Sequence, residues 1–97
     1  MVTVFHLDRG RLVLTHYCSA GNHPRMRART TTSPDQPLEF ATFDVANLGH
    51  AAEGNMQARS MRFSSANEMV QTWVWREKNE NRPVVFRLKR QSPSSLP

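Results

Sequence analysis

The sequence predicts an all-β fold, an antiparallel meander that curls into a barrel or half-barrel. Apolar and polar residues alternate along most of the chain with the period of two that is typical of strands. Clusters of glycine, proline, asparagine and serine separate these runs at short intervals. No segment carries a long helical period, and parallel pairing would need crossover helices, so neighbouring strands should pair antiparallel. About seven short strands are expected, at a spacing typical of sandwiches and barrels.

The first element is a β-hairpin over residues 2–18. Both arms alternate, and Gly10 in the turn between them is free to adopt positive φ. Two chemically reactive side chains, His16 and Cys18, lie two residues apart on the second arm. They should therefore share one strand face, together with the leucines of the same arm.

Five further strands are expected, over residues 25–31, 38–43, 55–63, 68–76 and 84–90. Turn residues mark the connections between them. Asp44 should cap a short helical turn over residues 45–48, which Gly49 would end. Residues 77–82 should form a polar hairpin loop before the last strand.

Chain length and composition indicate one domain over residues 1–91, followed by a disordered tail over residues 92–97. Hydrophobic residues make up 38% of the 97 residues, which is thin for a free-standing domain. No apolar run has the length of a membrane span, and the N-terminus lacks the pattern of a signal peptide. We therefore expect a cytoplasmic protein with no membrane association.

Arginine carries nearly all of the basic charge, which gives a formal net charge of +5. A basic balance is typical of proteins that bind polyanions. Alternation puts Arg25, Arg27 and Arg29 on one strand face, but no aromatic residue for base stacking is interleaved with them. We interpret this stripe as a solvated face and expect no nucleic-acid partner. In an alternative interpretation, Arg25 turns inward and pairs with an anionic ligand group.

His16, Cys18 and the loop residue His23 are of the types that bind zinc. The spacings of known zinc motifs are absent and no carboxylate lies nearby in sequence, so we predict neither a metal nor another cofactor. Catalysis through Cys18 would need a base within hydrogen-bond reach, and His16 qualifies only if the two side chains lean together. The alternative is that both residues simply line the interior.

Aromatic and methionine side chains supply a candidate binding surface. Trp73 and Trp75 share one face of their strand with Met69, and Phe40 lies on the apolar face of another strand. Facing inward, such side chains can line a pocket for a small apolar ligand, although they are more often plain core. A barrel of about eight strands has room for its own side chains or for one small ligand.

Several short motifs follow one another along the chain. Leu-Val-Leu-Thr-His-Tyr-Cys over residues 12–18 is followed by Gly-Asn-His-Pro-Arg-Met over residues 21–26. Later come Phe-Ala-Thr-Phe-Asp-Val-Ala-Asn-Leu over residues 40–48, Gly-Asn-Met over residues 54–56 and Trp-Val-Trp over residues 73–75. In order and spacing these motifs resemble a lipocalin-like family of bacterial β-barrel domains of unknown function, and the resemblance covers nearly the whole chain.

The resemblance implies a lipocalin-like fold, a curved antiparallel sheet around an apolar cavity, and it implies no established activity. Domains of this family usually begin upstream of the segment equivalent to Val2, so this chain should correspond to the later part of such a domain. Position 55 is asparagine where the family often has histidine.

The expected function is non-catalytic binding of a small apolar or amphipathic ligand. The candidate ligand-binding residues are His16, Cys18, Asn22, Arg25, Phe40, Trp73 and Trp75. Two alternatives remain open: an enzyme that uses His16 and Cys18 in the same cavity, and an interaction module whose interior is only a core. An open sheet of about seven strands would expose unpaired edges and an apolar face, so we also expect a homodimer.

Overall fold

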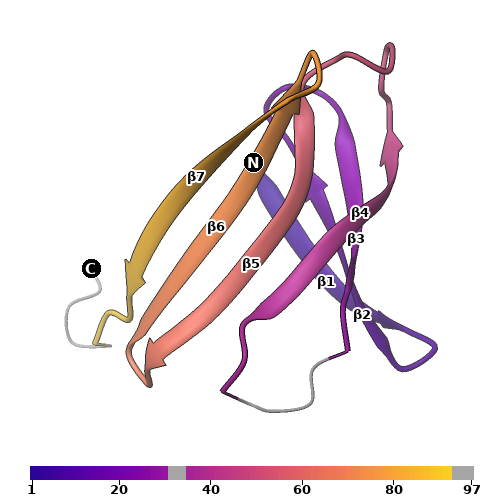
Figure 1. Cartoon of the computed structure of the whole chain (residues 1–97). Helices are drawn as coiled ribbons and strands as arrows, with labels where there is room; N and C mark the ends of the chain where they lie inside the picture. The colour runs from indigo at the N-terminus through magenta and orange to yellow at the C-terminus, as the bar shows by residue number, and fades with distance from the viewer. Residues whose placement is uncertain (31–34, 93–97) are drawn as a thin grey trace.

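The computed structural model describes residues 1–30 and 35–92, which form one sheet of seven antiparallel strands (Figure 1). The strands are β1 (Val2–Asp8), β2 (Arg11–Tyr17), β3 (His23–Ala28), β4 (Leu38–Ala46), β5 (Asn55–Ser65), β6 (Glu68–Glu77) and β7 (Glu80–Lys89). Each strand pairs with its neighbours in sequence, which confirms the predicted antiparallel meander. The described residues contain no helix that is long and apolar enough to cross a membrane.

The sheet is strongly curled but is not closed into a barrel. β1 and β7 are its two edges and are not hydrogen-bonded to each other. The rings of His16 on β2 and Trp73 on β6 nevertheless lie 4.6 Å apart between centroids, although three strands separate β2 from β6 in the sheet. Phe5 on β1 and Phe40 on β4 are likewise 6.0 Å apart. Such contacts require the two ends of the sheet to bend toward each other, as Figure 1 shows.

The hydrophobic core lies on the inner side of this curl, which we call the concave face. Its five buried members come from the four strands β2, β3, β4 and β6: Leu14, Met26, Ala28, Phe40 and Trp73. Leu12, Leu38, Met56 and Met61 pack against this cluster. The opposite side, which we call the outer face, carries Arg25, Arg27 and Phe43. Phe40 and Trp73 are therefore core residues as well as candidate ligand contacts.

The predicted helical turn after Asp44 is wrong, because β4 continues through Ala46. Asp44 and Val45 pair with Arg25 and Pro24 of β3, so their backbone groups find ladder partners. β3 begins at His23, earlier than the sequence pattern indicated, and this longer ladder leaves no room for a helical turn. Asn47, with a φ of 58°, follows the last paired residue of β4.

The predicted polar loop over residues 77–82 is also wrong. β6 and β7 are joined by a two-residue turn at Lys78 and Asn79, with φ values of 50° and 64°. Positive φ at both central residues is the geometry that suits the twist of a hairpin, and asparagine tolerates it well. β7 therefore starts at Glu80 and includes Pro83, which an edge strand accommodates because one side of its backbone needs no partner.

Pairing is uneven along the sheet. β5 and β6 pair along nearly their whole length, whereas β4 and β5 pair only from Leu38↔Met61 to Ala41↔Ala58. One side-chain hydrogen bond supplements this short junction, from Thr42 Oγ1 to the Met56 carbonyl (3.0 Å). The end of the predicted third strand, the turn after it and the predicted disordered tail fall partly on residues 31–34 and 93–97, outside the described residues.

Candidate functional site

His16 is a buried histidine at the centre of the concave face. It belongs to β2, where Thr3 of β1 is its direct cross-strand partner. Thr3 Oγ1 and His16 Nδ1 form a hydrogen bond of 2.9 Å, and the imidazole ring lies against Trp73. The other ring nitrogen, Nε2, is buried and has no hydrogen-bond partner among the described residues. Buried polar atoms are rarely left without a partner, so this nitrogen marks the position as unusual.

Arg59 brings a full positive charge to the same place. It lies on β5 between Phe40 and Trp73 in the pairing register, and only 6% of its surface is exposed. Its guanidinium carbon lies 4.5 Å from the centroid of Trp73 and 5.3 Å from that of Phe5. Its Nε and Nη1 atoms are buried and have no hydrogen-bond partner in the described part of the chain. Aromatic faces thus surround the cation, but no carboxylate neutralises it there.

The electrostatics of the two groups are coupled. Burial lowers the pKa of His16 below its usual value of 6.5, and the charges of Arg59 and of the chain's amino terminus lower it further. Burial also lowers the pKa of Arg59, yet a guanidinium remains charged at any physiological pH. At neutral pH the buried part of the concave face therefore holds the uncompensated Arg59 cation beside the neutral imidazole of His16.

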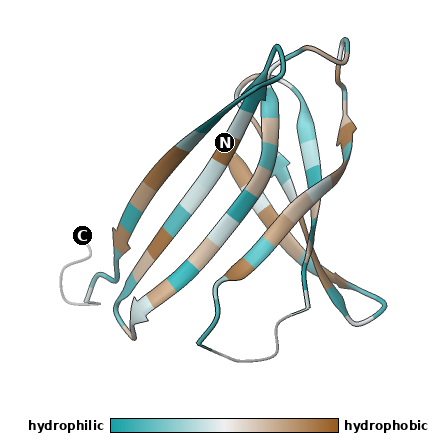
Figure 2. Ribbon diagram, viewed as in Figure 1, coloured by the Kyte–Doolittle hydropathy of each residue, from teal (hydrophilic) through white to brown (hydrophobic). Residues whose placement is uncertain are grey.

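An exposed apolar surface adjoins this pair. Arg59 is aligned in register with Trp73 on β6 and Val84 on β7. The next two same-face rows across β5, β6 and β7 are Met61, Gln71 and Phe86, and then Phe63, Met69 and Leu88. Val84, Phe86 and Leu88 are all exposed, and an apolar band is visible in the middle of β7 in Figure 2. We call the concave surface of β5–β7 beyond Arg59 the apolar strip.

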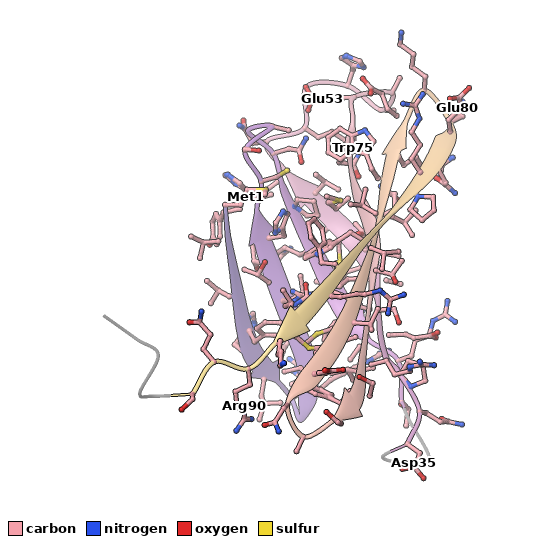
Figure 3. All side chains as sticks on the ribbon, turned by 90° about the vertical axis from the view of Figure 1, so that its left-hand side faces the viewer. Met1, Asp35, Glu53, Trp75, Glu80 and Arg90 are labelled. Carbon is pink, nitrogen blue, oxygen red and sulfur yellow. The ribbon has the colours of Figure 1, made fainter. Side chains whose placement is uncertain are left out.

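Asn22 and Trp75 lie at one end of the sheet, together with the loop over residues 47–54. Asn22 is fully buried, and its Nδ2 donates to the Gly54 carbonyl (2.8 Å) and to Glu53 Oε2 (3.3 Å). The Trp75 ring covers Gly54 so closely that a Cβ there would overlap it. Figure 3 shows Glu53 and Trp75 at the end of the molecule that also carries Glu80. Asn22 therefore fastens two loops together, and its Oδ1 atom is buried without a partner among the described residues.

Within the described residues, the partners of Cys18 and Arg25 are groups other than His16 and Arg59. Cys18 is a buried free thiol just after β2, and its backbone hydrogen-bonds with Asn22 and Gly21. Arg25 lies on the outer face and pairs with Asp44, whose pKa is lowered chiefly by the hydrogen bond from Arg25. The inward orientation considered for Arg25 is thus not observed, because the longer β4 places Asp44 directly opposite it.

The stripe of Arg25, Arg27 and Arg29 has an aromatic neighbour that sequence spacing did not indicate. The guanidinium carbons of Arg25 and Arg27 lie 5.2 Å and 4.2 Å from the Phe43 centroid. Arg29 pairs with Glu39 at 3.7 Å. Two of the three arginines thus have carboxylate partners on the same face, which reduces the charge available to phosphates.

Arg59, Thr3 and Phe5 are the site residues that sequence reasoning missed. The signal for Arg59 was present, because it alternates in phase with Met61 and Phe63 on the apolar face of its strand. An arginine at a position that alternates with buried apolar side chains is unusual. Thr3 carried no comparable signal, since its partnership with His16 depends on the exact hairpin register.

The described surface also has a depression of about 260 Å³ between β4, β5 and β6. Ala41, Ala58, Ser60 and Thr72, which alternate with the core residues, line it together with Phe40 and Arg59. It lies where the β4–β5 pairing is short and does not include His16 or Trp73. Among residues 1–30 and 35–92, no group of three histidine, cysteine, aspartate or glutamate side chains is placed to hold a metal ion.

No protein-family model, curated protein or solved structure matches this chain.

Proposed function

We propose that this protein binds a small, partly apolar molecule on the concave face of its sheet, without catalysing a reaction. The observation that carries the proposal is the pair of buried, unpartnered polar groups at Arg59 and His16. A buried polar group without a partner typically costs about 1–3 kcal/mol, and more when it is charged. A ligand that supplies the missing partner would relieve that cost.

The apolar strip is the natural place for the rest of the ligand. The concave surface near β1–β4 is filled by Leu14, Met26 and Phe40, each at most 2% exposed. On β7, by contrast, Val84, Phe86 and Leu88 are 39%, 48% and 44% exposed. A small molecule on this strip would bury apolar surface and still reach the Arg59 row at Trp73.

In this proposal the curled sheet acts as a lipocalin-like half-barrel. A ligand would lie along the opening between the β1 and β7 edges rather than inside a closed cavity. The loop over residues 47–54 supports one end of the sheet through Asn22 and through a hydrogen bond from Lys78 N to the Ala52 carbonyl (3.3 Å).

The enzyme alternative has less support in the geometry. The contacts of His16 are with Thr3 and Trp73, and those of Cys18 are with the backbone of the following loop. A nucleophile needs its base within hydrogen-bond reach. A module with only a packed core would account for Phe40 and Trp73 but not for the unpartnered atoms of Arg59.

Titration of the protein with a panel of neutral, anionic and cationic amphiphiles, followed by tryptophan fluorescence, tests the proposal. At least one class should bind and shift the emission, because Trp73 borders the strip. Phe86→Asp, on the concave face, should abolish the binding, whereas Val85→Asp, one residue away on the outer face, should leave it intact. Absence of binding across the panel, or equal binding by both variants, would contradict the proposal.

A further inference from the structure

We infer that the ligand is an amphipathic carboxylic acid, whose carboxylate pairs with Arg59 and His16 while its tail lies on the apolar strip. This inference rests on the proposed function and specifies its ligand class.

Charge balance indicates a monoanion. Arg59 is a permanent cation buried on the concave face, and no carboxylate of the described residues pairs with it. Burying a charge is unfavourable unless an opposite charge accompanies it. A single carboxylate neutralises one guanidinium, whereas a neutral ligand leaves the charge uncompensated and a dianion reverses it.

The hydrogen-bonding groups favour an acceptor. A guanidinium has only donors, and two of the Arg59 nitrogens have no protein acceptor within the described residues. The Thr3 hydroxyl can donate to His16 Nδ1, which leaves the proton of a neutral imidazole on Nε2. In that tautomer His16 Nε2 becomes a third donor on the same face. Carboxylate oxygens, which only accept, complement all three.

The surroundings of Arg59 favour an acid with an apolar body. Trp73 and Phe5 cover the guanidinium, so water is largely excluded from it and charge-assisted hydrogen bonds are strengthened. The only exposed apolar side chains in register with this position on β7 begin at Val84 and continue to Phe86 and Leu88. A tail attached to the carboxylate can follow that direction.

Two matched ligand pairs test the inference: decanoate against decanol, and phenylbutanoate against phenylbutanol. Calorimetric titration of the whole chain should show each acid binding about 10- to 100-fold more tightly than its alcohol, as expected for hydrogen bonds to a charged group. Arg59→Met should remove this preference while retaining weak binding of both partners. Arg62→Met, an exposed arginine of the same strand on the outer face, should keep the preference.

The outcomes separate the inference from the proposed function. Equal binding of acids and alcohols by the unaltered protein would overturn the carboxylate assignment while leaving apolar-ligand binding standing. A preference for acids that survives in Arg59→Met would also overturn it. Absence of binding by all four compounds and by the wider amphiphile panel would overturn both. Circular dichroism of each variant shows whether lost binding reflects lost structure.

Discussion

The burial of Arg59 carries a cost in folding stability. Only 6% of the Arg59 surface is exposed, its guanidinium lies against aromatic rings, and its unpartnered nitrogens have lost their hydration. The aromatic contacts offset part of this desolvation cost but supply no opposite charge. Replacing an uncompensated buried ion with an apolar side chain of similar length is often neutral or stabilising.

We therefore predict that Arg59→Met leaves the free energy of unfolding unchanged or raises it by about 1 kcal/mol in the absence of ligand. Urea denaturation followed by circular dichroism measures this. Arg62→Met provides the matched exposed control and should change stability by less than about 0.5 kcal/mol. A loss of more than about 1 kcal/mol in Arg59→Met would mean that the cation–π contacts dominate instead.

The imidazole of His16 makes the folded state sensitive to acid. Its folded-state pKa is lowered by burial, by Arg59 and by the amino terminus, from a usual value of 6.5. The unfolded chain therefore takes up a proton on His16 at a higher pH than the folded protein does. The contribution of His16 to the free energy of unfolding should fall as the pH drops below about 6.5. Below the folded-state pKa of His16 this contribution should stop changing with pH.

The free energy of unfolding should thus have a positive slope against pH in this window, and His16→Gln should reduce that slope. Urea denaturation at a series of pH values from 7.5 downward measures it. His6→Gln, an exposed histidine on β1, is the control. An unchanged slope in His16→Gln would show that other groups cause the acid sensitivity.

Among the elements, the loop over residues 47–54 makes hydrogen bonds to two other connections of the sheet. It receives hydrogen bonds from Asn22 of the β2–β3 loop and from Lys78 N of the β6–β7 turn. Asn47 Nδ2 also donates to the Gly21 carbonyl (2.9 Å). The loop therefore links strands from both halves of the sheet, and Gly54 at its end is the point where Trp75 packs closest.

Gly54→Ala should destabilise the fold by about 1–3 kcal/mol, because the added methyl group would overlap the Trp75 ring. Thermal denaturation measures the loss. Gly49→Ala, in the same loop, is the control, since its new Cβ would meet only the flexible Glu53 side chain. A variant Gly54→Ala as stable as the unaltered protein would show that Trp75 can move away without cost.

Strand existence was predictable from the sequence, but several strand ends were not. Alternation located all seven strands because side chains on the two faces meet different environments. The end of β4 depends on whether β3 offers partners for Val45 and Ala46, and alternation within one segment cannot reveal this. The tight turn at Lys78 and Asn79 was hidden because neither residue is glycine.

The candidate site was predictable only where it depends on alternation within one strand. The phase of the β2 arm predicted that His16 would share the apolar face, and His16 is buried there. The meeting of His16 with Trp73 depends on the curl of the whole sheet, which brings β2 to β6. Asn22 belonged to the same motif as His16, but only the folded loops show that its amide binds Gly54 and Glu53.

At the scale of the whole molecule, the two free edges of the sheet differ in character. β7 carries Pro83 and several cationic side chains, features that discourage further strand pairing. β1 has no proline, lysine or arginine, and its side chains Val2, Val4, Phe5 and Leu7 are 41–70% exposed. Antiparallel pairing of β1 with β1 of a second copy would bring no like-charged lysine or arginine side chains together.

We therefore predict a two-fold homodimer formed through the β1 edge. Sedimentation at micromolar concentrations should show a dimer for the unaltered chain. Val4→Lys should yield a monomer, because the pairing would bring two like charges together across the edge. Val85→Lys, at an exposed valine of β7, should remain dimeric. A monomeric unaltered chain, or dimers that dissociate only in Val85→Lys, would contradict this assignment.

Because every strand pairs only with its sequence neighbours, a single cut between two strands separates only one strand pairing. A cut between Gly49 and His50 yields one piece with β1–β4 and another with β5–β7. Their reassociation would depend on the short β4–β5 junction and on contacts such as that of His16 with Trp73. If a carboxylic acid pairs with both His16 and Arg59, it would join the two pieces, and the divided chain would then serve as a split reporter for that acid.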